Sequence, residues 1–306
     1  MKYIYMLNYS DNYKDLCNLE MKSIWGFIPS DKTFIATKYI NPSKSVFIKG
    51  CIAIIAEEKS LEELYESIKA YHLFFNGYKI IYIKSDDDLT YKDRLKALRM
   101  IGFSIEGDFK LQNPEIELAF TKFNDKWVFG KYIRNDNAWM LRKQKPFNYS
   151  YALDIILAKT IINIAVENKY DLHVVDPCCG IGTVIIEGRF NGVDIKGFDI
   201  NPNVVRKCNR NLCYFGFEGD VKNQNIKDIT EHFDIAIVDL PYGKFSKTSL
   251  SEQRLIINKT RQIAKKALFV TMSEMDELFI SAGFTIKDRC YVQKRDQFSR
   301  FISVCY

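Results

Sequence analysis

Apolar and polar positions in the second half of the chain alternate between two periods. Short apolar runs rich in Val, Ile and Phe predict strands at 172–177, 194–200, 233–241 and 267–272. After the second run, Asn201 takes the place of a helix cap and Pro202 that of the first helical residue. Val204, Cys208 and Leu212 then recur every four residues and form one apolar stripe. This alternation predicts a mainly parallel sheet with helices on both faces, and the segments 285–293 and 299–306 predict an antiparallel hairpin at its edge.

The first half of the chain has a different order of elements. Strand patterns lie at 2–8, 45–57 and 77–85, helix patterns at 13–26, 60–75 and 90–103, and a hairpin pattern at 116–133. Ser60 and Glu63 stand at the spacing of a capping box, which marks one helix start. Pro146 interrupts the chain before a long apolar helix pattern at 151–168. We therefore predict an α+β domain over 1–141, a linker over 142–150 and a second domain over 151–306.

Composition adds few constraints. The net charge of +6 permits a polyanionic partner without requiring one, and basic residues cluster at 142–145, 259–266 and 293–300. No apolar run approaches the ~20 residues of a membrane span. Polar residues from Asn8 to Asn12 interrupt what would be the apolar core of a signal peptide. The eight cysteines are scattered without a CxxC pair, and the three histidines stand alone. We expect a cytoplasmic protein without membrane attachment or a metal site.

A glycine-containing turn follows the strand at 172–177, in the sequence VVDPCCGIGT (174–183). Gly180 and Gly182 allow the backbone to approach a ligand closely, and the helix that follows offers unpaired N–H groups. The loop lacks the third glycine of a dinucleotide site, and Asp176 would repel a diphosphate. A carboxylate suits the ammonium and sulfonium groups of S-adenosylmethionine instead, and Asp199 could accept hydrogen bonds from its ribose. The alternative is an ordinary turn capped by Asp176.

Two motifs in this half resemble those of a known enzyme class. The loop DPCCGIGT resembles the first motif of class I methyltransferases that modify amino groups, and DLPYG (239–243) resembles their fourth motif, usually written (D/N)PPY. Their order along the chain also matches. Taken alone, DLPYG is also compatible with an ordinary turn after a strand. Within this class the chain resembles the THUMP-containing tRNA guanine-N2 methyltransferases, and the resemblance extends to the segments 2–26, 105–120 and 142–165.

The resemblance implies a fold and an activity. The fold is a Rossmann-like methyltransferase domain with a mainly parallel seven-stranded sheet and an antiparallel C-terminal hairpin. It is preceded by an α+β, ferredoxin-like or degenerate THUMP-like domain that binds RNA. The implied activity is methylation of the exocyclic N2 of a guanosine in tRNA, with S-adenosylmethionine as cofactor. The chain departs from the family pattern at Leu240, where proline is usual, and at the adenine-contacting acid, which falls at Asn225 with Asp220 and Asp228 as alternatives.

The same resemblance assigns roles to individual residues. Asp239 would accept one hydrogen bond from the target amino group, and the Pro241 carbonyl or a neighbouring backbone carbonyl would accept the other. Tyr242 would stack on the base. Tyr149 and Ser150 would line the methionine end of the cofactor or cap the following helix. The expected cofactor-binding residues are Asp176, Pro177, Cys179, Gly180, Gly182, Thr183, Asp199, Ile200, Asn225 and Asp239. The expected RNA-binding residues are Lys143, Lys145, Lys244, Phe245 and Lys247.

Three other functions fit parts of the same pattern. A ribosomal RNA guanine-N2 methyltransferase would use the same chemistry on another RNA. A DNA methyltransferase acting on adenine N6 or cytosine N4 would share the (D/N)PPY tetrad, although no extra target-recognition domain is evident. A non-catalytic RNA-binding protein could keep the fold, but the intact Asp239, Pro241 and Tyr242 argue against it.

Overall fold

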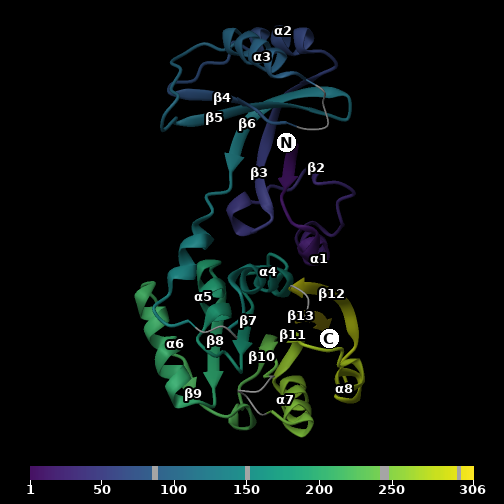
Figure 1. The fold of residues 1–306 in the computed structure, drawn as a ribbon, viewed down its shortest axis with the longest axis vertical. Coiled ribbons are helices and arrows are strands. Elements are labelled where there is room, and N and C mark those ends of the chain that lie inside the picture. The colour runs from purple at the N-terminus through teal and green to yellow at the C-terminus, as the bar shows by residue number, and fades with distance from the viewer. Residues whose placement is uncertain (85–88, 149–151, 242–247, 295–297) are drawn as a thin grey trace. The chain divides into compact units, whose positions relative to one another are not determined.

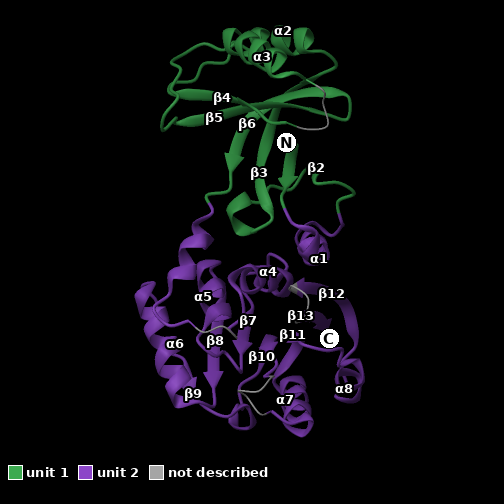
Figure 2. Cartoon of the chain, in the orientation of Figure 1, with its two compact units in different colours: residues 1–8, 29–136 green, residues 9–28, 137–306 purple. Residues whose placement is uncertain are grey.

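The structure is a computed structural model that describes residues 1–84, 89–148, 152–241, 248–294 and 298–306. The chain divides into two compact units (Figure 2). Unit 1 comprises residues 1–8 and 29–136, and unit 2 comprises residues 9–28 and 137–306. Each unit has its own sheet.

Unit 1 is built on a six-stranded sheet in the order β2-β1-β3-β6-β5-β4. Its strands are β1 (Tyr3–Leu7), β2 (Thr33–Ala36), β3 (Ile48–Glu58), β4 (Tyr78–Tyr82), β5 (Ile116–Phe123) and β6 (Lys126–Arg134). Neighbouring strands are antiparallel except for the parallel pair β4 and β5. Helices α2 (Leu61–Ala70) and α3 (Tyr91–Phe103) cover one face of the sheet (Figure 1). The α+β character and the predicted hairpin are confirmed, whereas β2 is an addition to the predicted strands.

Unit 2 contains a seven-stranded sheet in the order β12-β13-β11-β10-β7-β8-β9. Its strands are β7 (His173–Asp176), β8 (Asp194–Asp199), β9 (Lys222–Asn223), β10 (Phe233–Asp239), β11 (Ala264–Thr271), β12 (Ile286–Lys294) and β13 (Phe298–Cys305). The strands β7 to β11 are parallel, and the β12–β13 hairpin joins β11 in the antiparallel direction. This is the predicted methyltransferase-type sheet with its closing hairpin.

Helices of unit 2 pack around this sheet (Figure 1). They are α1 (Lys14–Trp25), α4 (Ile155–Val166), α5 (Thr183–Phe190), α6 (Pro202–Tyr214), α7 (Leu250–Ile263) and α8 (Asp276–Ser281), with the 3-10 helices η3 (Ala138–Gln144) and η4 (Ile226–Asp228). The predicted cap of α6 is confirmed, because Asn201 accepts from the N–H groups of Asn203 and Val204. Within the described ranges, no helix is long and apolar enough to cross a membrane, and no three side chains cluster as metal ligands do.

The predicted domain boundary is wrong at residues 9–28. The sequence places this segment in a domain over 1–141, but its helix α1 packs against α4 and β12 of unit 2. Its buried face includes Leu16, Leu19 and Glu20, and the Asn163 side chain of α4 donates to Glu20 Oε1 at 2.6 Å. The buried carboxylate has its partner in α4, so the tertiary contacts assign this helix to unit 2.

The predicted linker over 142–150 is also corrected for its first residues. Residues 138–144 form η3, which belongs to unit 2. Arg142 is buried there and donates from Nε and Nη2 to the two carboxylate oxygens of Glu187 in α5, at 2.6 and 2.7 Å. A buried, bidentate ion pair holds a segment in place, so this stretch is part of the folded unit.

Candidate active site

Three carboxylates meet at one edge of the unit 2 sheet. Asp176, Asp199 and Asp239 are the last residues of β7, β8 and β10. These strands are parallel and adjacent in the order β10-β7-β8, so their carboxyl ends lie at the same edge. Burial raises the pKa of Asp176 well above its usual range, and the charges of Asp239 and Asp199 raise it further. The structure therefore brings together the three acids predicted from distant motifs.

The loop between β7 and α5 is shaped by its glycines. Gly180 and Gly182 have φ angles of 55° and 83°, in the left-handed region that favours glycine. A Cβ at Gly182 would lie 2.4 Å from Cys208 Sγ. The Gly180 N–H donates to Asp199 Oδ2 at 3.0 Å, and the Cys178 N–H donates to Asp176 Oδ1 at 3.2 Å. The loop and two of the acids thus hold one another in position.

Pro177 and Cys179 are the buried residues at the start of this loop. The Cys179 N–H donates to the Phe198 carbonyl at 3.0 Å, which ties the loop to β8. A hydrogen bond with Cys208, together with burial, raises the pKa of the Cys179 thiol well above its ordinary value. Cys179 therefore acts here as a packing residue and not as a reactive thiol.

The end of β8 presents both a polar and an apolar surface. Besides Gly180, Asp199 accepts from the Asn201 N–H at 2.8 Å, and burial raises the pKa of its carboxyl group. Ile200 follows and is 67% exposed, so an apolar side chain stands in solvent beside three acids. Such a side chain can cover one face of a flat ring, and the contact of Ile200 with the cofactor stays a prediction.

The segment after β9 differs in part from expectation. Asn225 caps η4, since its side-chain oxygen accepts from the Lys227 N–H at 3.0 Å. Its predicted contact with adenine stays a prediction. Asn223 was missed: it lies opposite Asp199 in the β8–β9 register and donates to the Asp199 and Ile200 carbonyls, both at 2.9 Å. It fixes the backbone that carries Asp199, and only strand pairing could have pointed to it.

Asp239 has an unusual environment. Its Oδ1 is buried and has no hydrogen-bond partner in the described parts of the chain. Burial raises the pKa of Asp239 to about 6, against the opposing effect of the Arg300 charge. Next along the chain, the Pro241 carbonyl accepts from Gln253 Nε2 of α7 at 3.0 Å. The end of β10 is thus anchored to α7, and a buried acceptor of Asp239 stays available.

Arg300 is a residue that sequence analysis missed. It lies on β13, is buried, and places Nη1 2.7 Å from Met272 Sδ. Burial lowers the pKa of its guanidinium, while the charges of Asp239 and Asp154 raise it. The sequence showed a basic cluster at 293–300, but nothing local distinguished this arginine as the one turned toward the acids.

The predicted RNA-binding lysines separate into two kinds. Lys143 is exposed, with its ammonium 5.2 Å from the centre of the Trp139 ring. Lys145 instead donates to Thr183 Oγ1, at the start of α5, at 2.6 Å, and burial lowers its pKa to about 8. Its ammonium is therefore engaged beside the glycine loop, and its contact with RNA stays a prediction.

Several predicted positions lie outside the described residues. These are Tyr242, Lys244, Phe245 and Lys247 after the Asp239 strand, and Tyr149 and Ser150 before α4. Their assigned roles stay predictions. Asp154 caps α4, accepting from the Ile156 and Leu157 N–H groups.

The described residues fit S-adenosylmethionine as a ligand. Three carboxylates gather at one sheet edge, and one of them has a buried acceptor to which no group in the described ranges donates. Such a set favours a ligand with positive charge, which the ammonium and sulfonium groups supply, and disfavours a diphosphate. The glycine loop leaves room for close approach by the backbone, and Ile200 offers an apolar surface for the adenine ring.

Comparison with known proteins gives the same enzyme class. A family described as UPF0020, RMKL-like, methyltransferase domain, matches residues 142–276. A tRNA (guanine(10)-N2)-dimethyltransferase of Methanothermobacter thermautotrophicus is 26% identical over 225 residues, 67% of this chain and 67% of that protein. A protein of the same name from Pyrococcus abyssi is 22% identical over 173 residues, 53% of this chain and 52% of the relative. The chain thus matches about two thirds and about half of the length of these curated relatives.

A solved structure is similar over the whole chain. The crystal structure of TrmN from Thermus thermophilus matches 99% of both chains at 11% identity, with a TM-score of 0.50. At this identity the likeness supports the fold alone. The domain match confirms the predicted enzyme class and the predicted methyl donor, S-adenosylmethionine. Residues 142–276, which carry three acids and a glycine loop at the carboxyl edge of their sheet, are thus similar to the UPF0020 family, described as an RMKL-like methyltransferase domain.

Proposed function

We propose that this protein methylates the exocyclic N2 of a guanosine in tRNA. The observation that carries the proposal is Asp239, a strand-end carboxylate beside the glycine loop whose buried Oδ1 accepts from no group in the described residues. Two relatives named tRNA (guanine(10)-N2)-dimethyltransferase support the choice of substrate, and they make position 10 the first one to test.

The chemistry explains why an acceptor is needed at this position. The lone pair of the guanine amine is delocalised into the ring, so the amine is a weak nucleophile. S-adenosylmethionine supplies an electrophilic methyl group on a sulfonium. In the transfer, the amine nitrogen forms a bond to the methyl carbon, the carbon–sulfur bond breaks, and its electron pair stays on sulfur. The methylated nitrogen then loses one proton, and no oxidant or reductant is required.

The chain's own residues orient the amine and stabilise its developing charge. Asp239 can accept one N–H of the amino group through its available oxygen. The Pro241 carbonyl already accepts from Gln253 and keeps a second lone pair for the other N–H. Positioning of this kind holds the nitrogen in line for attack, and the negative charge of Asp239 favours the positive charge that forms there.

Unit 1 has a separate proposed role, which is to bind RNA. The support is the resemblance of residues 105–120 to part of a THUMP module, together with an α+β fold whose sequence contains no glycine-rich ligand loop. A tRNA substrate also agrees with the proposed cytoplasmic location. The target base must leave its stack to reach the edge of the unit 2 sheet.

The deciding experiment compares the wild type with Asp239→Asn on an unmodified tRNA transcript, with methyl-labelled S-adenosylmethionine. After nuclease digestion, mass spectrometry should find N2-methylated guanosine with the wild type and a loss of at least about 100-fold with the variant. Parallel incubations contain ribosomal RNA or DNA in place of tRNA. Label found only in ribosomal RNA, or only in DNA as N6-methyladenine or N4-methylcytosine, would show that the substrate is that nucleic acid and not tRNA. Tight RNA binding without any methylated product would favour a non-catalytic protein.

A further inference from the structure

A basic groove lies on unit 2, outside the cluster of acids. It runs between α7 and η4 and has a volume of about 400 Å³. Lys227 of η4 lines one side, and Arg254 and Lys259 of α7 line the other. Ser251, Asn258 and Gln262 supply uncharged polar groups, and among the described residues no acidic side chain lines the groove.

The cations of this groove are not neutralised by ion pairs. In the described ranges, none of the three has a carboxylate within salt-bridge distance, although Lys227 contributes to lowering the pKa of Glu252. The Glu252 carboxylate belongs to the capping box of α7 and accepts from the Ser249 N–H at 2.7 Å. Three cations without paired anions in one concave surface create a positive potential that attracts a polyanion.

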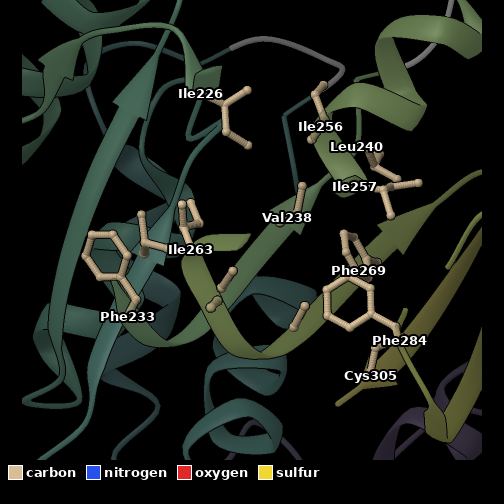
Figure 3. Close-up of a cluster of buried hydrophobic side chains, with 14 of the residues drawn as sticks. Ile226, Phe233, Val238, Leu240, Ile256, Ile257, Ile263, Phe269, Phe284 and Cys305 are labelled. Carbon is tan, nitrogen blue, oxygen red and sulfur yellow. The ribbon is translucent and has the colours of Figure 1, made fainter. Parts of the chain in front are cut away.

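The two walls of the groove are held by a common core. Ile226 of η4 and Ile256 and Ile257 of α7 belong to one cluster of buried side chains (Figure 3). The same cluster contains Val238 of β10 and Leu240, which follows Asp239. Leu255, which lines the groove, packs against the same cluster. The backbone beneath the cations is therefore fixed before any ligand arrives, which lowers the entropy cost of binding.

The groove and the candidate active site share helix α7. Gln253, one residue before Arg254, donates to the Pro241 carbonyl, two residues after Asp239. The helix that carries Arg254 and Lys259 is therefore also the helix that anchors the target motif.

We infer that the groove between α7 and η4 binds the phosphate backbone of the RNA substrate next to the target guanosine. The inference rests on the proposed function and adds a substrate-positioning surface on unit 2. Lys227, Arg254 and Lys259 contact phosphates, and the amides of Asn258 and Gln262 donate to phosphate or ribose oxygens. These contacts carry no base specificity and set the register of the strand.

The test measures the dissociation constant of an unmodified tRNA transcript at several salt concentrations, in the full chain. The triple variant Lys227→Gln, Arg254→Gln, Lys259→Gln should reduce the slope of log K against log salt by about two to three. At low salt each single variant should weaken binding by about threefold to tenfold. Affinity for S-adenosylhomocysteine should not change, because no groove residue belongs to the candidate cofactor site.

Two controls isolate the effect of position and of charge. Lys265→Gln removes one charge at the amino end of β11, where Lys265 is 83% exposed and pairs with Asp234, so it should leave the slope nearly unchanged. The charge-conserving triple variant Lys227→Arg, Arg254→Lys, Lys259→Arg should also keep the wild-type salt slope. If the glutamine triple variant kept the wild-type salt slope and affinity, the groove would not be the phosphate-binding surface, and the proposed enzymatic function would be unaffected. A wild type that neither binds nor methylates tRNA would overturn the proposed function, and the inference with it.

Discussion

At the scale of single residues, the reactivity of the site depends on how Asp239 is charged. A carboxyl group at the end of an apolar strand loses solvation, so its pKa rises to about 6, while the Arg300 charge limits the rise. Asp176 and Asp199 have raised pKa values for the same first reason, burial. The three carboxyl groups repel one another when all are ionised, and a bound cation offsets this repulsion and lowers their pKa values. Binding of the positively charged methyl donor therefore favours the ionised form of Asp239, which accepts a hydrogen bond from the amine.

The raised pKa of Asp239 predicts an acid limb in the activity profile. Because the ionised carboxylate accepts from the amine, kcat/KM for S-adenosylmethionine, which reports the enzyme before the donor binds, should rise with pH through about 6 and be about tenfold lower at pH 5 than on the plateau. Initial rates of tRNA methylation from pH 5 to 8 measure this. In Asp239→Asn, which cannot titrate there, the residual activity should lack the limb near pH 6. A wild-type profile that is flat over this range would contradict the role of Asp239.

At the scale of elements, the pair of Arg142 and Glu187 joins η3 to the helix that follows the glycine loop. Both side chains are buried, and the Arg142 guanidinium lies 4.5 Å from the centre of the Phe190 ring. Lys145, three residues later, reaches Thr183 at the start of the same helix. Residues expected in a linker therefore brace both ends of the element that carries the loop.

Breaking this buried pair should be costly. Arg142→Met leaves the Glu187 carboxylate buried without its partner, and we expect a loss of about 3–5 kcal/mol in the free energy of unfolding, measured by urea denaturation. The double variant Arg142→Met, Glu187→Leu should recover most of the lost free energy of unfolding, since it leaves no buried charge without a partner. Arg134→Met breaks a bidentate but exposed pair with Glu117 and should cost only about 0–1 kcal/mol. Equal losses in the two single variants would show that burial is not the cause.

At the scale of the whole molecule, the chain crosses between two units more than once. Residues 9–28 leave unit 1 after its first strand, contribute α1 to unit 2, and return to unit 1 at residue 29. The methyltransferase unit is therefore discontinuous in sequence. A fragment that begins at residue 137 would lack the helix that covers α4, with its buried Leu16, Leu19 and Ile24.

This topology predicts the behaviour of shortened chains. A variant in which a flexible Gly/Ser linker replaces residues 29–136 should fold and bind S-adenosylhomocysteine as the full chain does, but bind tRNA more weakly. The fragment 137–306 should be less stable by about 5 kcal/mol or more, the burial energy of three large apolar side chains. Thermal unfolding and calorimetry compare the two. If the shorter fragment were equally stable, α1 would not be an integral part of unit 2.

Local signals in the sequence were sufficient for the order of elements and for the centre of the site. Helix caps at Ser60 and Asn201, the glycine turn, and acids at the ends of apolar runs act over a few residues. A parallel sheet necessarily brings the carboxyl ends of adjacent strands together. The amino-acid sequence alone therefore suffices to place Asp176, Asp199 and Asp239 at one edge of the sheet.

Burial and pairing between distant segments were decided only by the tertiary structure. The partner of Glu20 lies 143 residues away along the chain, and that of Arg142 lies 45 residues away. No local sequence pattern therefore shows that α1 packs in unit 2, or that the start of the expected linker is folded. In the sequence, Lys145 and Arg300 look like surface cations. A charged side chain turns inward only where a specific partner offsets its desolvation, and the partners of these two residues lie far away along the chain. The sequence thus determined which chemistry the site contains, and the packing of remote segments determined which residues support it.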